Sequence, residues 1–200
     1  MVGEAVDGEV LQLGSPPRIS GGRDLVLVSA FKWEWRKGWD VLLRAYWSAF
    51  GPADRVVLRL VTYVMQDAVE DGASPRVEDH IESFAADVYG AGAASERARV
   101  EVVPGSGALS RLEVARVLSS ADCFVLPTRG EGWGLPVAEA MTYGVLTAVT
   151  NWSGPVDFAG DGGSLAIPVE GVDEDGFGVP STAGLEEVLR RVHGAWASGG

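Results

Sequence analysis

Short apolar runs alternate along the chain with stretches whose apolar residues recur at helical spacing. The run Leu25–Ala30, LVLVSA, is typical of a strand covered on both faces, as strands of a parallel sheet are. The next apolar positions recur at i, i+3, i+4 and i+7, which predicts one buried helix face. These positions are Leu42, Ala45, Tyr46 and Ala49. The same strand-then-helix order continues towards the C-terminus.

The full pattern predicts an α/β chain with about six strands. The strands are expected at Leu25–Ala30, Val56–Val61, Arg99–Val103, Cys123–Pro127, Leu146–Thr150 and Leu165–Val169. Helices are expected around 42–49, at Arg76–Tyr89, after Ser110 (with Glu113 completing a capping box), at Pro136–Gly144 and at Leu185–Trp196. Short strands separated by helices indicate a Rossmann-like, three-layer parallel sheet. Ligands of such sheets bind beyond the carboxyl ends of the strands, where the strand order reverses.

The ends and the composition of the chain set its class. Residues 1–22 carry Gly, Pro, Ser and acids with little periodicity, which indicates a linker, and 23–200 are expected to form one domain. The N-terminus lacks the features of a signal peptide, and no apolar run approaches the ~20 residues that span a bilayer. We therefore expect a soluble, cytoplasmic protein without a transmembrane segment.

Charge and metal-binding residues exclude several functions. The formal net charge of −12 disfavours nucleic acid and anionic membranes as partners, although a few placed cations and helix N-termini can still hold a small anion. Cys123 lies in an apolar run and is expected to be a buried, inert thiol. With one cysteine and two histidines, His80 and His193, a zinc site is not expected.

The strongest chemical signal follows the fourth predicted strand. Residues 128–140 read TRGEGWGLPVAEA, so three glycines precede a helix and let a ligand approach the backbone. The first N–H groups of that helix attract a diphosphate. Glu131 lies on the loop and Glu139 about one turn into the helix, so each can accept hydrogen bonds from vicinal hydroxyls of a sugar or ribose.

These residues resemble the signature of retaining glycosyltransferases of the GT-B fold, family four (group one). The likeness rests on Glu131 and Glu139 with Gly-x-Gly-Leu-Pro between them. Val2–Asp7 is similar to the family's interdomain linker, and Arg36–Ala45 contains the family's Lys-Gly before a helix. Three further segments match in the same order: Ser120–Pro127, Ala140–Gly144 and Asn151–Pro155. The resemblance covers roughly residues 2–193 and implies the nucleotide-sugar-binding half of a GT-B enzyme.

The resemblance implies a role for each matched residue. Glu131 and Lys37 would be the catalytic residues, with Glu131 facing the donor sugar and Lys37 contacting the diphosphate. Glu139 would hold the ribose. The donor would also contact the backbone of Gly132, Trp133, Gly134 and Leu135. The family's usual second cation is an arginine where this chain has Phe31, so either Lys32 replaces it or it is missing.

The implied enzyme is a retaining, metal-independent, hexosyl-type glycosyltransferase without a cofactor, whose substrate is a nucleoside-diphosphate sugar. Its acceptor site would lie in an N-terminal domain that this chain lacks, so the chain alone is expected to be inactive. The alternative is a non-catalytic nucleotide- or sugar-binding or regulatory module that keeps the fold.

Less specific motifs admit plainer interpretations. Gly105–Ser110 resembles a truncated dinucleotide fingerprint that lacks its third glycine and its acid. Asp173–Asp175 resembles a metal-binding acid triplet but is expected to be a solvated loop. Arg36 is expected on the surface. Trp33 and Trp35 are expected to pack a long loop, with stacking on a sugar as the alternative.

Overall fold

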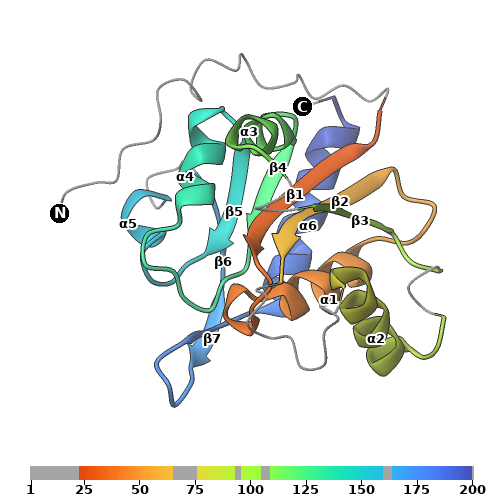
Figure 1. Ribbon diagram of the computed structural model, residues 1–200, viewed down its shortest axis with the longest axis horizontal. Coiled ribbons are helices and arrows are strands. Elements are labelled where there is room, and N and C mark those ends of the chain that lie inside the picture. The colour runs from red at the N-terminus through yellow and green to blue at the C-terminus, as the bar shows by residue number, and fades with distance from the viewer. Residues whose placement is uncertain (1–22, 65–75, 93–95, 105–108, 160–163, 200) are drawn as a thin grey trace.

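A single parallel sheet of six strands, in the order β3-β2-β1-β4-β5-β6, forms the centre of the molecule (Figure 1). The computed structural model describes residues 23–64, 76–92, 96–104, 109–159 and 164–199. The strands are β1 (Leu25–Lys32), β2 (Val56–Tyr63), β3 (Arg99–Pro104), β4 (Cys123–Leu126), β5 (Leu146–Thr150) and β6 (Ser164–Ile167). The predicted Rossmann-like sheet is confirmed. The predicted linker 1–22, with its Val2–Asp7 match, and 105–108 of the dinucleotide-like loop lie outside the described residues.

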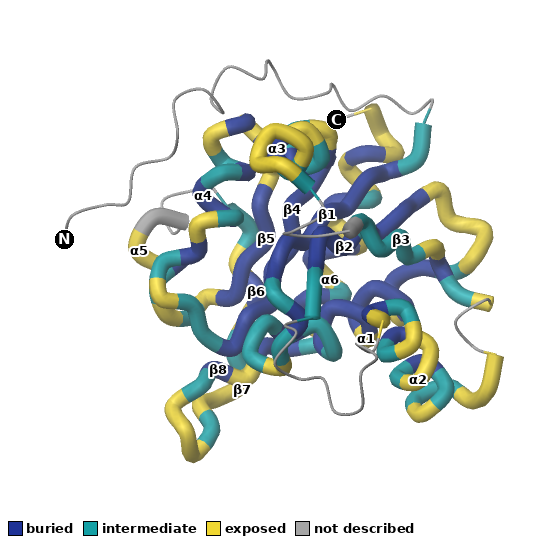
Figure 2. Tube along the Cα trace, in the orientation of Figure 1, coloured by how far each residue is buried: buried dark blue, intermediate teal, exposed yellow. Residues whose placement is uncertain are grey.

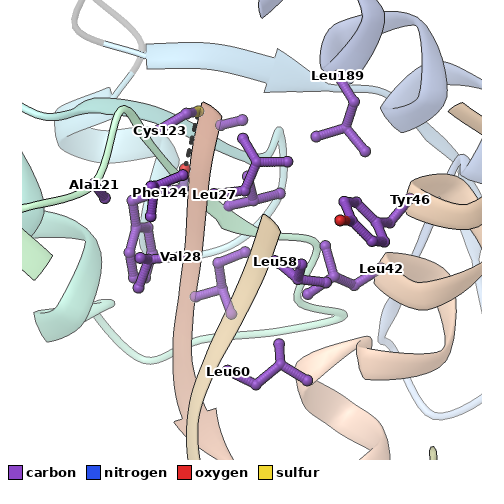
Figure 3. Packing of buried hydrophobic residues seen from close by; sticks show 14 of the residues in the cluster. Leu27, Val28, Leu42, Tyr46, Leu58, Leu60, Ala121, Cys123, Phe124 and Leu189 are labelled. Atoms are coloured by element: carbon purple, nitrogen blue, oxygen red, sulfur yellow. Dashed lines mark hydrogen bonds between the residues drawn. The ribbon is translucent and has the colours of Figure 1, made fainter. Parts of the chain in front are cut away.

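Helices cover both faces of the sheet. They are α1 (Trp39–Ala49), α2 (Val77–Tyr89), α3 (Arg111–Ser119), α4 (Leu135–Thr142), α5 (Val156–Ala159) and α6 (Thr182–Ala197), with a 3-10 turn, η2 (Trp35–Lys37), before α1. Helices α1 and α6 pack on each other, and so do α3 and α4. Figure 3 shows Tyr46 of α1 and Leu189 of α6 on one side of β1 and Phe124 on the other. Within the described segments, no helix combines the length and apolar character needed to span a bilayer.

Strands β1, β2 and β4, in the middle of the sheet, are deeply buried (Figure 2). In β1, seven of eight residues are buried, as expected for a strand with helices on both faces. Cys123 at the start of β4 is fully buried, and burial raises the pKa of its thiol to about 12. The thiol is therefore protonated at neutral pH, which confirms the prediction of an inert cysteine.

Helix α3 begins with the predicted capping box. The Ser110 Oγ atom accepts from the Glu113 backbone N–H at 3.3 Å, and the Ser110 N–H donates to the Glu113 carboxylate at 2.7 Å. Both groups would otherwise lack a partner at the helix start. This local motif was readable from the sequence because both partners lie within four residues.

The predicted strand Leu165–Val169 is wrong at its C-terminal end. Strand β6 ends at Ile167, and Val169 begins β7 (Val169–Val172), which forms an antiparallel hairpin with β8 (Gly178–Pro180). Pro168 explains the break, because it has no N–H for the parallel ladder. Its carbonyl oxygen instead accepts from the Ser181 N–H at 2.8 Å. The chain therefore leaves the sheet at this residue.

The acid triplet Asp173–Asp175 lies at the tip of this hairpin. The Asp173 Oδ1 atom accepts from the backbone N–H groups of Asp175, at 3.0 Å, and Phe177, at 2.8 Å. Glu174 and Asp175 are exposed. Such side chain-to-backbone bonds are typical of Asp in turns, so the triplet has a local structural role.

Candidate functional site

An open cleft of about 740 Å³ lies at the carboxyl end of β1, where the strand order reverses between β1 and β4. Its walls come from the end of β1, the η2 turn, the loop after β4 and the start of α4. Seven of the eight predicted site residues line it: Lys32, Lys37, Glu131, Gly132, Trp133, Gly134 and Leu135. Glu139 is not among the lining residues. The location agrees with the rule for ligand sites in such sheets.

The β1–α1 loop and the loop after β4 are held against each other by backbone contacts. The Arg129 N–H donates to the Arg36 carbonyl at 2.8 Å, and the Thr128 hydroxyl donates to the same oxygen at 3.1 Å. Gly38 lies so close to Pro127 that a Cβ atom on Gly38 would stand 1.9 Å from the Pro127 carbonyl oxygen. The φ of Gly38 is also positive, at +71°, which favours glycine. The two loops therefore form one unit.

A nearly buried ion pair joins the same loops. The Arg129 guanidinium donates to both Asp40 carboxylate oxygens, at 2.7 and 2.8 Å, and to the Trp35 carbonyl at 2.7 Å. It also lies 4.1 Å from the Trp35 ring centroid, a cation–π contact. Sequence analysis missed this pair. The available signal was an arginine inside the glycine loop and an acid in the first turn of the helix after Lys-Gly.

Two further segments support the loop that carries Glu131. The Glu131 N–H donates to the Ser153 hydroxyl at 2.9 Å, and the Gly154 N–H donates to the Glu131 carbonyl at 3.1 Å. The Gly178 N–H of the hairpin donates to the Arg129 carbonyl at 2.9 Å. The matched segment Asn151–Pro155 therefore lies directly behind the glycine loop.

Lys37 and Glu131, predicted as the catalytic residues, form an ion pair inside the cleft. Their side chains are only 12% and 11% exposed. The Arg36 guanidinium lies 3.9 Å from the other oxygen of Glu131 and donates to the Gly130 carbonyl at 2.5 Å. The expectation that Arg36 is a plain surface residue is therefore wrong, because it lines the cleft.

The position where the family usually has an arginine is filled by an apolar side chain. Phe31 is 7% exposed, lines the cleft and stacks on Trp33 at 5.9 Å between ring centroids. Trp33 is also buried and stacks on Trp39 at 4.8 Å, which confirms its packing role. Trp35 is 51% exposed and packs edge-on against Phe177. Lys32 lines the cleft as predicted and pairs with Glu34.

The start of α4 offers fewer hydrogen-bond donors than a typical helix. Gly134 caps it with a φ of +91° and no side-chain cap. Pro136, the second helical residue, has no N–H, and the Val137 N–H already donates to the Gly134 carbonyl at 2.9 Å. Neutralisation of a bound anion at this end would therefore depend mainly on the cations of the cleft.

Glu139 lies on α4, about one turn after the residues of this helix that line the cleft, and is partly buried. Burial raises the pKa of its carboxyl, and the nearby positive charge of Arg111 at the start of α3 partly opposes this. The structure thus separates the two glutamates: Glu131 faces the cleft, and Glu139 faces the α3 side.

Replacing Glu139 with glutamine should stabilise the folded protein without ligand. Because the folded state raises the pKa of Glu139, its ionisation opposes folding once the pH exceeds the usual carboxyl pKa. Glu139→Gln removes this penalty, so we expect Tm at pH 7 to rise by roughly 1–3 °C. The difference should disappear well below about pH 4, where the Glu139 carboxyl is protonated in both the folded and the unfolded state. Thermal unfolding across this pH range measures it, and a lower Tm for the variant at pH 7 would contradict it.

Comparisons with known proteins identify the family and the fold of this chain. The family model described as glycosyl transferases group 1 matches residues 22–192. A sequence search of curated proteins finds no significant match. Among solved structures, WaaG, a glycosyltransferase involved in lipopolysaccharide biosynthesis, is 20% identical, with a TM-score of 0.61 over 89% of this chain and 42% of its own. A UDP-forming α,α-trehalose-phosphate synthase from Burkholderia vietnamiensis is 13% identical, with a TM-score of 0.60 over 89% of this chain and 40% of its own.

One similar structure is itself a separate domain. The C-terminal domain of LpcC, a group 1 family glycosyl transferase from Francisella tularensis, is 13% identical with a TM-score of 0.63. The match covers 98% of this chain and 96% of that domain, whereas this chain spans about two fifths of WaaG and of the trehalose-phosphate synthase. The fold is that of one half of a GT-B glycosyltransferase. This chain belongs to the group 1 glycosyl transferases.

Proposed function

We propose that this chain binds a nucleoside-diphosphate sugar in the cleft and that, together with an acceptor-binding domain, it transfers the sugar with retention of anomeric configuration. The observation that carries the proposal is the Lys37–Glu131 pair. These residues lie 94 positions apart in the sequence and meet inside a cleft at the switch point of the sheet. A volume of about 740 Å³ is within the range of small-molecule sites.

Each residue has a distinct role in this proposal. Lys37 contacts the diphosphate and stabilises the negative charge that develops on it as the sugar leaves. Glu131 accepts hydrogen bonds from the sugar hydroxyls, and the Gly132–Leu135 backbone lines the donor. Glu139, on the other side of α4, holds the ribose hydroxyls. Because cations of the cleft neutralise the diphosphate, the reaction needs no metal ion and no cofactor.

Family membership and the related folds support the identity of the donor. The trehalose-phosphate synthase with this fold is described as UDP-forming, as expected for an enzyme that uses a nucleotide sugar. A hexosyl donor fits the same family. The acceptor site is proposed to lie in a second domain, so that the purified chain binds donor but does not transfer it. A cytoplasmic location and the lack of a nucleic-acid partner stay predictions from the charge and composition.

One observation favours a second candidate, a non-catalytic nucleotide- or sugar-binding or regulatory module. Phe31 is buried in the aromatic stack where the family usually places a cation, so it contributes no charge to the diphosphate. A module that only senses a nucleotide can function with this weaker arrangement. Transfer activity after addition of an acceptor-binding domain would separate the two candidates.

A titration of two ligands against two variants tests the proposed site. Glu139→Gln should weaken binding of a nucleoside diphosphate and of its nucleotide sugar alike, by about ten- to hundredfold, because charge-assisted bonds to the ribose are lost. Glu131→Gln should weaken the nucleotide sugar but not the bare diphosphate, which has no sugar ring and is no longer repelled by the charge of Glu131. Isothermal titration at fixed salt gives both affinities.

The same titration contains its controls. Repeating it with a chelator should leave the affinities unchanged, and a tenfold loss would show that a metal ion takes part. Equal effects of both variants on the bare diphosphate would refute the separate roles. Unchanged affinities in both variants would refute the site itself.

A further inference from the structure

The cations of the cleft are already paired with acids when no ligand is bound. Lys37 pairs with Glu131, and Lys32 pairs with Glu34. The Arg36 guanidinium lies 3.5 Å from the second oxygen of Glu34. One carboxylate therefore bridges two cations that precede Lys37, Lys32 at the end of β1 and Arg36 in the η2 turn. All of these side chains line the same cleft.

Glu34 and Glu131 differ in how firmly the surrounding structure holds them. The Glu131 loop is fixed by hydrogen bonds from the Asn151–Pro155 segment, and its carboxylate is nearly buried. The Glu34 side chain is 30% exposed, and although Glu34 caps η2, the turn has no side-chain cap hydrogen bond. The contacts described for the Glu34 carboxylate are with Lys32 and Arg36. The carboxylate is thus not needed to form the turn.

The charge on Glu34 persists at neutral pH. The hydrogen bond with Lys32, together with the charges of Lys32, Arg36 and Lys37, holds the pKa of Glu34 below its usual value despite partial burial. A stable negative charge in a cleft that must accept a diphosphate repels the ligand and competes for the same donors. The positive charge that the cleft can offer is reduced accordingly.

We propose that Glu34 is an internal counter-anion that sets the affinity of the cleft for phosphate groups, occupying Lys32 and Arg36 until the donor's diphosphate displaces it. This inference rests on the proposed function, because it assumes that the ligand is a nucleoside diphosphate or its sugar. It also identifies a substitute for the arginine that the family usually has at the position of Phe31. Lys32 and Arg36 together supply that positive charge. Glu34 therefore limits how tightly the released diphosphate is held.

Glu34→Gln tests this inference, because glutamine keeps the size of the side chain and removes the charge. Uridine, guanosine and adenosine diphosphates are tested on both proteins. We expect each diphosphate that binds the wild type to bind the variant about three- to tenfold more tightly. Because two more cations become available, affinity should also fall more steeply with salt concentration. Inorganic pyrophosphate should gain by a similar factor. Unchanged or weaker binding of these probes by the variant would overturn the inference.

Glu101→Gln is the matched control. Glu101 also bridges two cations, Arg59 at 2.9 Å and Arg99 at 3.4 Å, but it lies outside the cleft lining. Its removal changes the net charge by the same amount, so it should leave the affinity unchanged. Equal gains in both variants would mean that total charge is responsible and would overturn the role of Glu34.

The result also separates this inference from the proposed function. If the wild type binds a nucleoside diphosphate and Glu34→Gln binds it no better, only the counter-anion is refuted. If neither protein binds any of the three diphosphates, the proposed function is refuted and this inference with it.

Discussion

Gly38→Ala is expected to lower the free energy of unfolding by about 3 kcal/mol or more and to abolish ligand binding. The new Cβ atom would stand 1.9 Å from the Pro127 carbonyl oxygen, closer than atoms can approach, and the backbone on both sides is fixed. The left-handed φ of +71° adds strain for any side chain. Relief requires the β1–α1 loop to move away from the loop after β4, which separates Lys37 from Glu131.

Gly176→Ala provides the matched control for this prediction. Gly176 has a similar φ of +83°, but a Cβ atom there would meet no atom within 4 Å. Gly176→Ala should therefore lower the free energy of unfolding by only roughly 1–2 kcal/mol, the cost of a left-handed backbone conformation, and keep full affinity for ligand. Urea unfolding and ligand titration give both quantities. Similar losses in the two variants would show that the contact between Gly38 and Pro127 does not hold the site together.

Arg129→Met is expected to cost about 3 kcal/mol of stability. The change leaves the Asp40 carboxylate, 22% exposed, without its bidentate partner, and breaking a buried pair in this way is strongly destabilising. The Trp35 carbonyl also loses one of its two donors and keeps only the Gly38 N–H. Because these contacts position the η2 turn that carries Lys37, affinity for a diphosphate should fall as well. Urea unfolding measures the first effect and calorimetry the second.

A surface arginine with the same kinds of partner serves as its control. Arg190 bonds the Glu186 carboxylate at 3.0 Å and the Ser48 carbonyl at 2.8 Å but is 56% exposed, so Arg190→Met should cost less than about 1 kcal/mol. A double variant, Arg129→Met with Asp40→Asn, should be at least about 1 kcal/mol more stable than the sum of the single losses predicts. Strict additivity would show that the two side chains act independently.

The sheet was predictable because its information is local. Each parallel strand is a short apolar run such as LVLVSA, and each amphipathic helix repeats at 3.6 residues, so neither requires knowledge of distant segments. The error at Leu165–Val169 had a local signal too, since Pro168 within an apolar run weakens a strand. The β7–β8 hairpin was missed because its strands, of four and three residues, are too short to show an apolar pattern.

The candidate site was predictable only in part. Glu131, Lys37 and the glycines belong to contiguous motifs, and strand order places both motifs at one end of the sheet. Arg129, Asp40 and Glu34 could not be assigned from the sequence, because each depends on a partner that only the folded loops supply. The contacts of Arg36 with Glu34 and Gly130 in the cleft could not be predicted for the same reason. Ion pairs and hydrogen bonds between two loops do not produce a periodic pattern in the sequence.

The contacts behind the glycine loop constrain the order in which the protein acquires its binding site during folding. Residues 129–131 are held by Arg36, 94 positions away from Gly130, by Ser153, 22 positions away from Glu131, and by Gly178 of the hairpin. Closing loops between distant partners is slow, and Gly178 comes after the glycine loop in the sequence, so it is synthesised later. The first half of the sheet can assemble while the cleft is still incomplete. Affinity for the ligand therefore appears only after the C-terminal hairpin has docked, which makes binding a measure of complete folding.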